Sequence, residues 1–521
     1  MIALLLFCFQ SSQFAQDAPK AFGQITIDVS KQTPISPYIY GANFPFNSKD
    51  PKWVQFAKGF TVARMGGNRT TAYNWETNAS NAGNDYRYQN DGYMGSTEEP
   101  GKAVSDFYKP AAANGSVSIL TVPCAGYVAA DKGPDGDVNK TPNYLEARFN
   151  KSFASKPGGS YSLNPNTSDR SVYQDEFVNF VEKSKPAGAK TWYSLDNEPD
   201  LWQSTHVRIV PQNVGFAGIL ERGIAYATAV KKVAPGSLVF GPASYGWHGY
   251  RTFQDAPDRN DRDFLEFYLA KMKEAEVRTG KRLLDVLDIH WYPEAQGGGN
   301  RICGEKNNAE TDLARAQAGR SLWDPSYVES SWIADSLGKK PISLLPRTIG
   351  QISKNYPGTK LGITEYDFGG GSEPSGMVAQ ADVLGIYGRF GVFAACHWGI
   401  NHDRPAQVAG FGAFTNFDGK GGRFGSIGLN VVGETPAANS VYASIDPTIK
   451  GRIVIVAVNK LAKEQAIRVS LSIPKGSKAV GYQANVKNPY EPDSLGIDYG
   501  SSGVLFSLPA YGVGTIEIRT Q

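Results

Sequence analysis

Short apolar runs recur eight times along the first four-fifths of the chain, and most are separated by helix-like or long loop segments. They lie at 38–44, 61–65, 117–122, 190–195, 238–242, 286–291, 360–364 and 392–398. The clearest helical patterns between them cover 172–183, 213–233, 262–276 and 377–389. A strand followed by a helix, repeated, is typical of a parallel sheet, and eight such units close a (β/α)8 barrel. The sequence therefore predicts an α/β fold with a TIM barrel over residues 38–432.

The two ends of the chain show a different pattern. From about Gly433 the helical pattern stops, and short strand-like runs lie between turn residues. These runs are 452–459, 466–472, 479–485 and 514–519, and 21–29 near the start is also strand-like. The pattern predicts an antiparallel β-sandwich formed by residues 19–37 together with 433–521. Because no Pro/Ser/Thr-rich linker precedes it, we expect the sandwich to pack on the barrel.

The first residues indicate export. Residues 2–9 form an apolar run that is followed by polar Ser and Gln residues and by small residues at Ala15 and Ala18. This is typical of a signal peptide, which we place at 1–18, so a secreted or periplasmic enzyme is expected. No later run approaches the roughly 20 apolar residues of a membrane-spanning helix. Beyond the signal peptide the cysteines are Cys124, Cys303 and Cys396, an odd number that allows at most one disulfide among them.

Composition narrows the function classes. Lys plus Arg number 53 against 50 for Asp plus Glu, with no long run of one sign, which argues against a nucleic-acid partner and against a polybasic membrane anchor. Aromatic residues make up 12% of the chain, which supplies flat apolar faces that can stack on sugar rings as well as fill a core.

The candidate chemistry lies at the ends of two predicted strands. TWYSLDNEP at 191–199 and LGITEYDFGG at 361–370 each run from apolar residues into a glutamate, Glu198 and Glu365. Buried carboxylates are costly unless they are paired or used, and two of them at one end of a barrel is the arrangement that cleaves glycosidic bonds. The alternative is that each is an ordinary strand-end acid bonded to loop amides.

Longer motifs resemble glycoside hydrolase family 44. The resemblance rests on RMGGNRTTAYNWETNASNAGND at 64–85, SLDNEP at 194–199, HWYP at 290–293, TEYD at 364–367, and VYAS at 441–444 with VNK at 458–460. It implies a retaining endo-β-1,4-glucanase that acts on cellulose-type chains, with xyloglucan as a further substrate. It also implies that Glu198 is the general acid/base and Glu365 the nucleophile. The insertion at 297–318 and Cys124 depart from the expected pattern and leave substrate preference open.

Other residues are expected to bind substrate or to support the glutamates. Arg64 is the first choice for the cation that keeps Glu365 ionised, the alternative being an ion pair of the barrel core. Tyr292 is expected to donate a hydrogen bond to Glu365, and Asn197 to bond the sugar 2-hydroxyl. His290 is expected to be a hydrogen-bonding or subsite residue. The strand-end tryptophans are candidate sugar platforms, with Trp202 and Trp247 as first choices: Trp75, Trp202, Trp247, Trp291 and Trp398.

No cofactor is expected, and the sequence does not decide whether the protein binds a metal ion. The five histidines show no zinc-binding spacing, whereas the acidic stretches 131–137 and 255–263 are candidates for structural calcium or plain solvated turns. Two alternatives remain for the function. One is another glycosidase of the same clan, such as a xylanase, mannanase or arabinofuranosidase, and the other is a non-catalytic carbohydrate-binding protein. The expected partner is a β-glucan polysaccharide, and the chain is expected to be a monomer.

Overall fold

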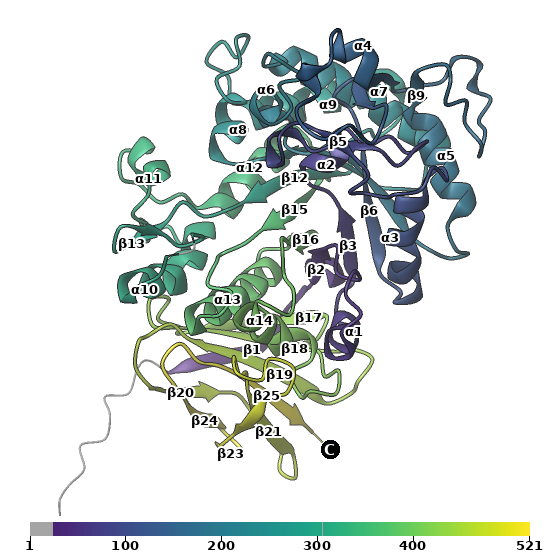
Figure 1. The fold of residues 1–521 in the computed structure, drawn as a ribbon. Helices are drawn as coiled ribbons and strands as arrows, with labels where there is room; N and C mark the ends of the chain where they lie inside the picture. The colour runs from purple at the N-terminus through teal and green to yellow at the C-terminus, as the bar shows by residue number, and fades with distance from the viewer. Residues whose placement is uncertain (1–23, 305, 521) are drawn as a thin grey trace, which may run out of the picture.

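The computed structural model describes residues 24–304 and 306–520, so the expected signal peptide at 1–18 lies outside the described residues. Two parts are visible in Figure 1: a barrel with helices around it, and a β-sheet domain built from both ends of the chain. The two predicted parts of the fold are therefore confirmed.

Eight parallel strands form the barrel and close it between the last and the first. In chain order they are β2 (Gly41–Asn43), β3 (Val62–Met65), β6 (Val117–Val122), β10 (Thr191–Leu195), β11 (Val239–Ser244), β12 (Val286–Trp291), β15 (Lys360–Tyr366) and β16 (Ala394–His397). Each lies within or largely overlaps one of the eight apolar runs.

Helices cover the outside of the barrel. The longer ones are α3 (Lys102–Ala113), α5 (Gln174–Ser184), α7 (Gly215–Val233), α9 (Phe264–Thr279), α12 (Leu344–Asn355), α13 (Pro374–Arg389) and α14 (Pro405–Thr415). The four predicted helices are α5, α7, α9 and α13. The first begins later than expected, because 171–173 pair as strand β9 (Ser171–Tyr173).

Short elements occupy the loops. The helices among them are α1 (Pro51–Ala57), α2 (Asn68–Thr71), α4 (Tyr144–Arg148), α6 (Trp202–Thr205), α8 (Trp247–Thr252), α10 (Ala309–Gln317) and α11 (Trp332–Ser336). The strands are β4 (Ser80–Asn81), β5 (Asn90–Asp91), β7 (Tyr127–Ala129), β8 (Phe149–Phe153), β13 (Gln296–Gly297) and β14 (Asn300–Arg301). The 3-10 turns are η1 (Pro37–Ile39), η2 (Gly83–Asp85), η3 (Val138–Lys140), η4 (Pro157–Gly159), η5 (Pro199–Leu201) and η6 (Ala318–Leu322).

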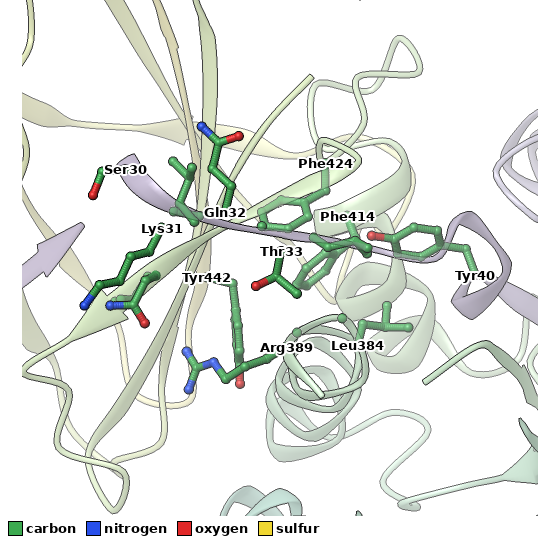
Figure 2. Close-up of a pocket in the computed structure, with 18 residues that line it drawn as sticks. Ser30, Lys31, Gln32, Thr33, Tyr40, Leu384, Arg389, Phe414, Phe424 and Tyr442 are labelled. Carbon is green, nitrogen blue, oxygen red and sulfur yellow. The ribbon is translucent and has the colours of Figure 1, made fainter. Parts of the chain in front are cut away.

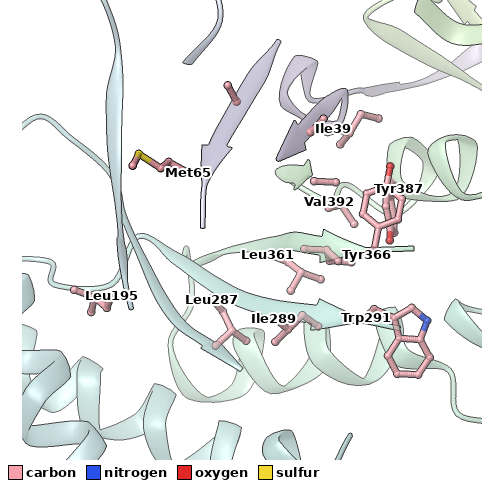
Figure 3. Close-up of a cluster of buried hydrophobic side chains, with 14 of the residues drawn as sticks. Ile39, Met65, Leu195, Leu287, Ile289, Trp291, Leu361, Tyr366, Tyr387 and Val392 are labelled. Carbon is pink, nitrogen blue, oxygen red and sulfur yellow. The ribbon is translucent and has the colours of Figure 1, made fainter. Parts of the chain in front are cut away.

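Alternation along the barrel strands separates two cores. Val62, Trp192 and Val286 belong to a small cluster inside the barrel. Leu287 and Ile289, on the same strand as Val286, belong to the large cluster between strands and helices, part of which Figure 3 shows. Successive side chains of a strand point to opposite faces, so the register decides which residues face the barrel interior.

The second domain is one ten-stranded sheet with its own apolar core. Its strands are β1 (Ile25–Pro34), β17 (Ile427–Val432), β18 (Asn439–Ile445), β19 (Arg452–Asn459), β20 (Gln465–Ser470), β21 (Lys478–Gln483), β22 (Asp493–Leu495), β23 (Ile497–Gly500), β24 (Gly503–Leu508) and β25 (Val513–Arg519). Two expectations need correction. The boundary at 432/433 is too late, because β17 pairs with β1 and β18, and the pairing of β1 with β20 is parallel.

The sheet packs directly on α13 and α14, as expected. Buried Asp382 of α13 binds Lys460 of the sheet domain at 2.7 Å and accepts a hydrogen bond from Tyr442 at 2.7 Å. A cavity of about 600 Å³ lies at this junction, with side chains of β1, α13 and α14 around it (Figure 2). Neither Glu198 nor Glu365 lines it, so it is separate from the candidate active site.

Cys124, Cys303 and Cys396 are all free thiols, so these three form no disulfide with one another. Across the described part of the chain, we find no helix with the length and apolar character needed to cross a membrane.

Candidate active site

Glu365 faces the barrel interior because β15 contains a β-bulge. Ile289 pairs with Ile363, yet the next residue, His290, pairs with Glu365, so Thr364 is the extra residue. Simple alternation would direct Glu365 outward with Ile363, which packs in the outer core. The bulge instead turns Glu365 towards His290, on the same side as Thr364, which alternation already directs inward. Bulges commonly re-aim side chains next to active sites.

The loop after β10 holds Asp196 and Glu198, on either side of Asn197, in an uncommon backbone conformation. Asp196 has φ of 65° and Glu198 has φ of 44°, both in the left-handed region. The Asp196 carboxylate accepts the backbone N–H of Asn197 at 2.8 Å, and Trp202 Nε1 donates to the Asn197 carbonyl at 3.1 Å. Strained positions of this kind persist only where the surroundings hold them, and they gather at functional sites.

Glu365 is surrounded by donors. Arg64 Nη1 lies 2.6 Å from its Oε1, and Tyr292 donates its hydroxyl to Oε2 at 2.8 Å. Arg64 also donates to the side-chain oxygens of Asn43 at 3.1 Å and of Asn197 at 2.8 Å. A cation and a hydroxyl donor both favour the ionised carboxylate, which is the form of a nucleophile.

Glu198 has a different environment. It is 8% exposed, and its Oε1 lies 2.8 Å from Nδ1 of His290. Burial raises the pKa of Glu198 to about 8, although Arg64 opposes that rise. Burial also lowers the pKa of His290 to about 4, so the imidazole is neutral near pH 7. Glu198 therefore retains its proton near neutral pH, as a general acid requires.

The two carboxylates are close neighbours. His290 Nδ1 lies 3.5 Å from Glu365 Oε2, and one oxygen of each glutamate and this nitrogen all lie within 4.8 Å of one another. In retaining glycosidases the carboxyl groups are about 5–5.5 Å apart, against about 6.5–9.5 Å in inverting enzymes. An upper limit of 4.8 Å between the nearest oxygens is compatible with the shorter of these two separations.

Comparison with known proteins agrees with this geometry. The sequence model of glycoside hydrolase family 44 matches residues 79–295. The structure of a family 44 endoglucanase from Clostridium thermocellum is 39% identical, with a TM-score of 0.87 and coverage of 95% of this chain and 99% of that one. A Paenibacillus polymyxa family 44 xyloglucanase, solved with xyloglucan, is 36% identical with a TM-score of 0.86, covering 96% of this chain and 100% of that one. The chain belongs to glycoside hydrolase family 44.

Longer relatives of family 44 also match. Endoglucanase A of Paenibacillus lautus is 40% identical over 450 residues, and the beta-mannanase/endoglucanase A of Caldicellulosiruptor saccharolyticus is 39% identical over 519. The matches cover 83% and 92% of this family 44 chain. They span only 62% and 38% of those proteins' own lengths.

Most of the expected site residues come together in this family 44 barrel. Arg64, Asn197, His290 and Tyr292 all lie within hydrogen-bonding distance of one another or of the two glutamates. Trp398 is also close, because its half-buried ring lies against Gly67, whose backbone N–H donates to Asn197 at 3.2 Å.

Four of the proposed sugar platforms are wrong. Trp75, Trp202 and Trp291 are each 1% exposed and Trp247 is 6% exposed, so none presents a free face to a sugar. Trp291 is on the outward side of β12, opposite His290, and Trp75 packs against Phe180 of α5. Adjacency to a strand end does not reveal which face of the strand a residue occupies.

Exposed aromatic side chains occur elsewhere in the loops after the barrel strands. Trp332 stacks on His248 at 4.6 Å between ring centroids, and Arg69 lies 4.1 Å from the ring centroid of Tyr93. Trp332 is 38% exposed and Tyr93 75% exposed. Neither lies within one of the family motifs or near Glu198 or Glu365 in the sequence, so the motifs gave no signal for them.

The acidic stretches proposed for calcium pair with arginines. Asp131 binds Arg148 at 2.7 Å, and Asp137 binds Arg208 at 2.6 Å. In the second stretch Asp263 binds Arg251 at 2.6 Å. Their oxygens serve ion pairs, and the structure adds no support for a calcium site at either stretch.

Proposed function

We propose that this family 44 chain is a retaining endo-β-1,4-glucanase that hydrolyses cellulose-type β-glucans and xyloglucan. The observation that carries the proposal is the close pair of buried carboxylates, one held by Arg64 and the other by His290. The relatives described as endoglucanases and as a xyloglucanase support the choice of substrate.

In the first step Glu365 attacks the anomeric carbon while Glu198 gives its proton to the leaving oxygen. The glycosidic bond breaks, and the sugar is held as an ester of Glu365. In the second step Glu198 takes a proton from water, which attacks the same carbon and releases Glu365. The two steps together retain the configuration of the anomeric carbon.

The surrounding residues support these roles. Arg64 and Tyr292 stabilise the charge on Glu365 before attack and when it leaves. The side-chain oxygen of Asn197 accepts from Arg64 and from Gly67, which directs its NH₂ group to other acceptors. We assign that group to the sugar 2-hydroxyl, a contact that strengthens in the oxocarbenium-like transition state.

Two experiments test the proposal. A 2-fluoro cellobioside should inactivate the enzyme and label a peptide containing Glu365, while NMR of early products should show retained anomers. Labelling at another residue would reassign the nucleophile, and inverted anomers would exclude the mechanism. Initial rates on carboxymethyl cellulose, xyloglucan, lichenan, xylan and mannan would test the substrate. A clear preference for xylan or mannan would favour another glycosidase of the clan.

The cellular context belongs to the same proposal. We propose that the enzyme is secreted or periplasmic, on the strength of the apolar run at 2–9, and that it acts as a monomer. The two-carboxylate reaction itself needs no cofactor. Activity should accordingly survive treatment with a chelator.

A further inference from the structure

Asp288 is a buried carboxylate directly below the catalytic pair. It lies on β12 two residues before His290, so both side chains face the barrel interior, and it is 0% exposed. Its Oδ2 accepts the hydroxyl of Thr364 at 2.8 Å, and its Oδ1 accepts the Thr364 backbone N–H at 3.3 Å. Asp288 takes no direct part in the two reaction steps proposed for Glu198 and Glu365.

Thr364 connects Asp288 to the catalytic centre. Its Oγ1 lies 3.4 Å from Nε2 of His290, whose other nitrogen lies 2.8 Å from Glu198 Oε1. Alternation with outward-facing Ile363 directs this hydroxyl into the barrel, and the β-bulge that follows adds Glu365 to the same side. Asp288, Thr364, His290 and Glu198 thus form one chain of contacts.

The Thr364 hydroxyl decides which group donates and which accepts in each of these hydrogen bonds. Thr364 has one hydroxyl proton, and when it is donated to Asp288, Oγ1 can only accept from His290. A neutral imidazole then carries its proton on Nε2, which leaves a lone pair on Nδ1. That lone pair accepts a hydrogen bond from the protonated carboxyl of Glu198. The opposite tautomer would donate from Nδ1 and stabilise ionised Glu198 instead.

We propose that Asp288 is a positioning residue that sets the tautomer of His290 through Thr364 and so keeps the proton on Glu198. The proposal rests on the acid/base role proposed for Glu198. It requires no proton to move between Glu198, His290, Thr364 and Asp288 during turnover. Glu198 exchanges its proton with the leaving oxygen and with water, while His290 keeps its own.

Other charged and titratable groups face this chain from the surrounding elements. They are Arg64, Asp85, Asp200, Tyr245, Tyr250, Tyr292, Glu365 and Cys396. Replacing Asp288 changes a charge that these groups also feel. Replacing Thr364 leaves every charge in place, so Thr364 variants isolate the hydrogen-bond chain.

The test compares Thr364→Val with Thr364→Ser in the full-length enzyme. The valine variant should shift the alkaline limb of the kcat/KM profile to lower pH by about one unit, as expected when one hydrogen bond no longer favours the neutral acid. The serine variant should keep the wild-type limb. Asp288→Asn should shift the limb in the same direction as valine, because its NH₂ group donates to Oγ1 and reverses the chain. An unchanged limb in Thr364→Val, or equal shifts in the serine and valine variants, would overturn the proposal.

A matched control tests whether the loss of any buried aspartate moves the limb, and NMR measures the tautomer of His290 directly. Asp382→Asn replaces another fully buried aspartate that accepts a hydroxyl, that of Tyr442, and should leave the limb unchanged. In wild type, ¹⁵N NMR of histidine-labelled enzyme should show His290 protonated on Nε2, with the signal assigned by its loss in His290→Asn. Protonation on Nδ1 would overturn the inference even if the variants fail to fold. Failure of Glu198→Ala to lose the limb would instead disprove the proposed acid/base.

Discussion

Arg64 and Glu365 form an ion pair of 2.6 Å in which the side chains are 0% and 5% exposed. The two residues come from β3 and β15, which are separated by two other strands of the barrel, and they meet because both face its interior. Removing one partner of such a pair leaves a buried charge without compensation. The negative charge of Glu365 therefore depends on Arg64 for its compensation.

Arg64→Met should lower kcat on a soluble aryl cellobioside by about 100-fold or more. The substitution removes the buried cation that stabilises the charge on Glu365 before attack and when it leaves. The measurement is steady-state kinetics per folded molecule. The control is Arg452→Met, which breaks the buried pair with Glu517 in the sheet domain and should lower stability without lowering kcat. Equal kcat values for the two variants would show that Arg64 does not support Glu365 in the reaction.

Glu198→Ala should remove the alkaline limb of the profile. The acid works only while protonated, so wild-type activity should fall as the pH rises through about 8. The variant should lose polymer hydrolysis yet still react with activated aryl glycosides, whose leaving group needs no proton. Azide should restore turnover and give a β-glycosyl azide, because azide attacks without a general base. Rescue of Glu365→Ala rather than Glu198→Ala would reverse the two roles.

His206→Phe should stabilise the fold in mild acid. His206 is 1% exposed, and burial lowers its pKa to about 4. The unfolded chain takes up a proton near the ordinary pKa of 6.5, so wild type loses stability as the pH falls from about 6.5 to 4. Relative to wild type, the variant should gain about 2 kcal/mol in free energy of unfolding between pH 7 and pH 5. Urea unfolding at both pH values measures this, and exposed His402→Phe should show no such gain.

Trp75→Ala should mainly lower stability, whereas Trp398→Ala should mainly weaken substrate binding. Trp75 is buried against the aromatic rings of α5, so its truncation should cost about 3–5 kcal/mol of stability while folded molecules stay active. Trp398 is half-buried beside the Asn197 amide contact, so its truncation should lower kcat/KM on cello-oligosaccharides by about tenfold or more, with a smaller loss of stability. Thermal unfolding and oligosaccharide kinetics on both variants provide the check. Similar losses of activity per folded molecule would contradict this division.

Much of the architecture follows from local patterns in the sequence. A barrel strand buried on both faces is a continuous apolar run, so all eight could be located without tertiary information. The same holds for β19, β20, β21 and β25 of the sheet domain, whereas β18, β22, β23 and β24 were not among the predicted runs. The glutamates could be identified because a charged residue at the end of a buried run is costly unless it has a function.

Other features depended on distant parts of the chain. Trp291 and His290 are neighbours in sequence, yet the register of β12 places one in the outer core and the other between the glutamates. The bulge at Thr364, which aims Glu365 inward, arises from pairing with strands on either side of β15.

The sequence by itself determined the order of the strands, the two-part fold and the chemical types at the strand ends, because these depend on local hydrophobic periodicity and on motif residues. Only the tertiary structure decided which strand-end side chains meet and which groups surround each glutamate. The physical reason is that burial and contact are set by segments far apart in the chain. Glu365 lies beside Arg64 across 301 residues, whereas Glu198 lies beside a neutral His290.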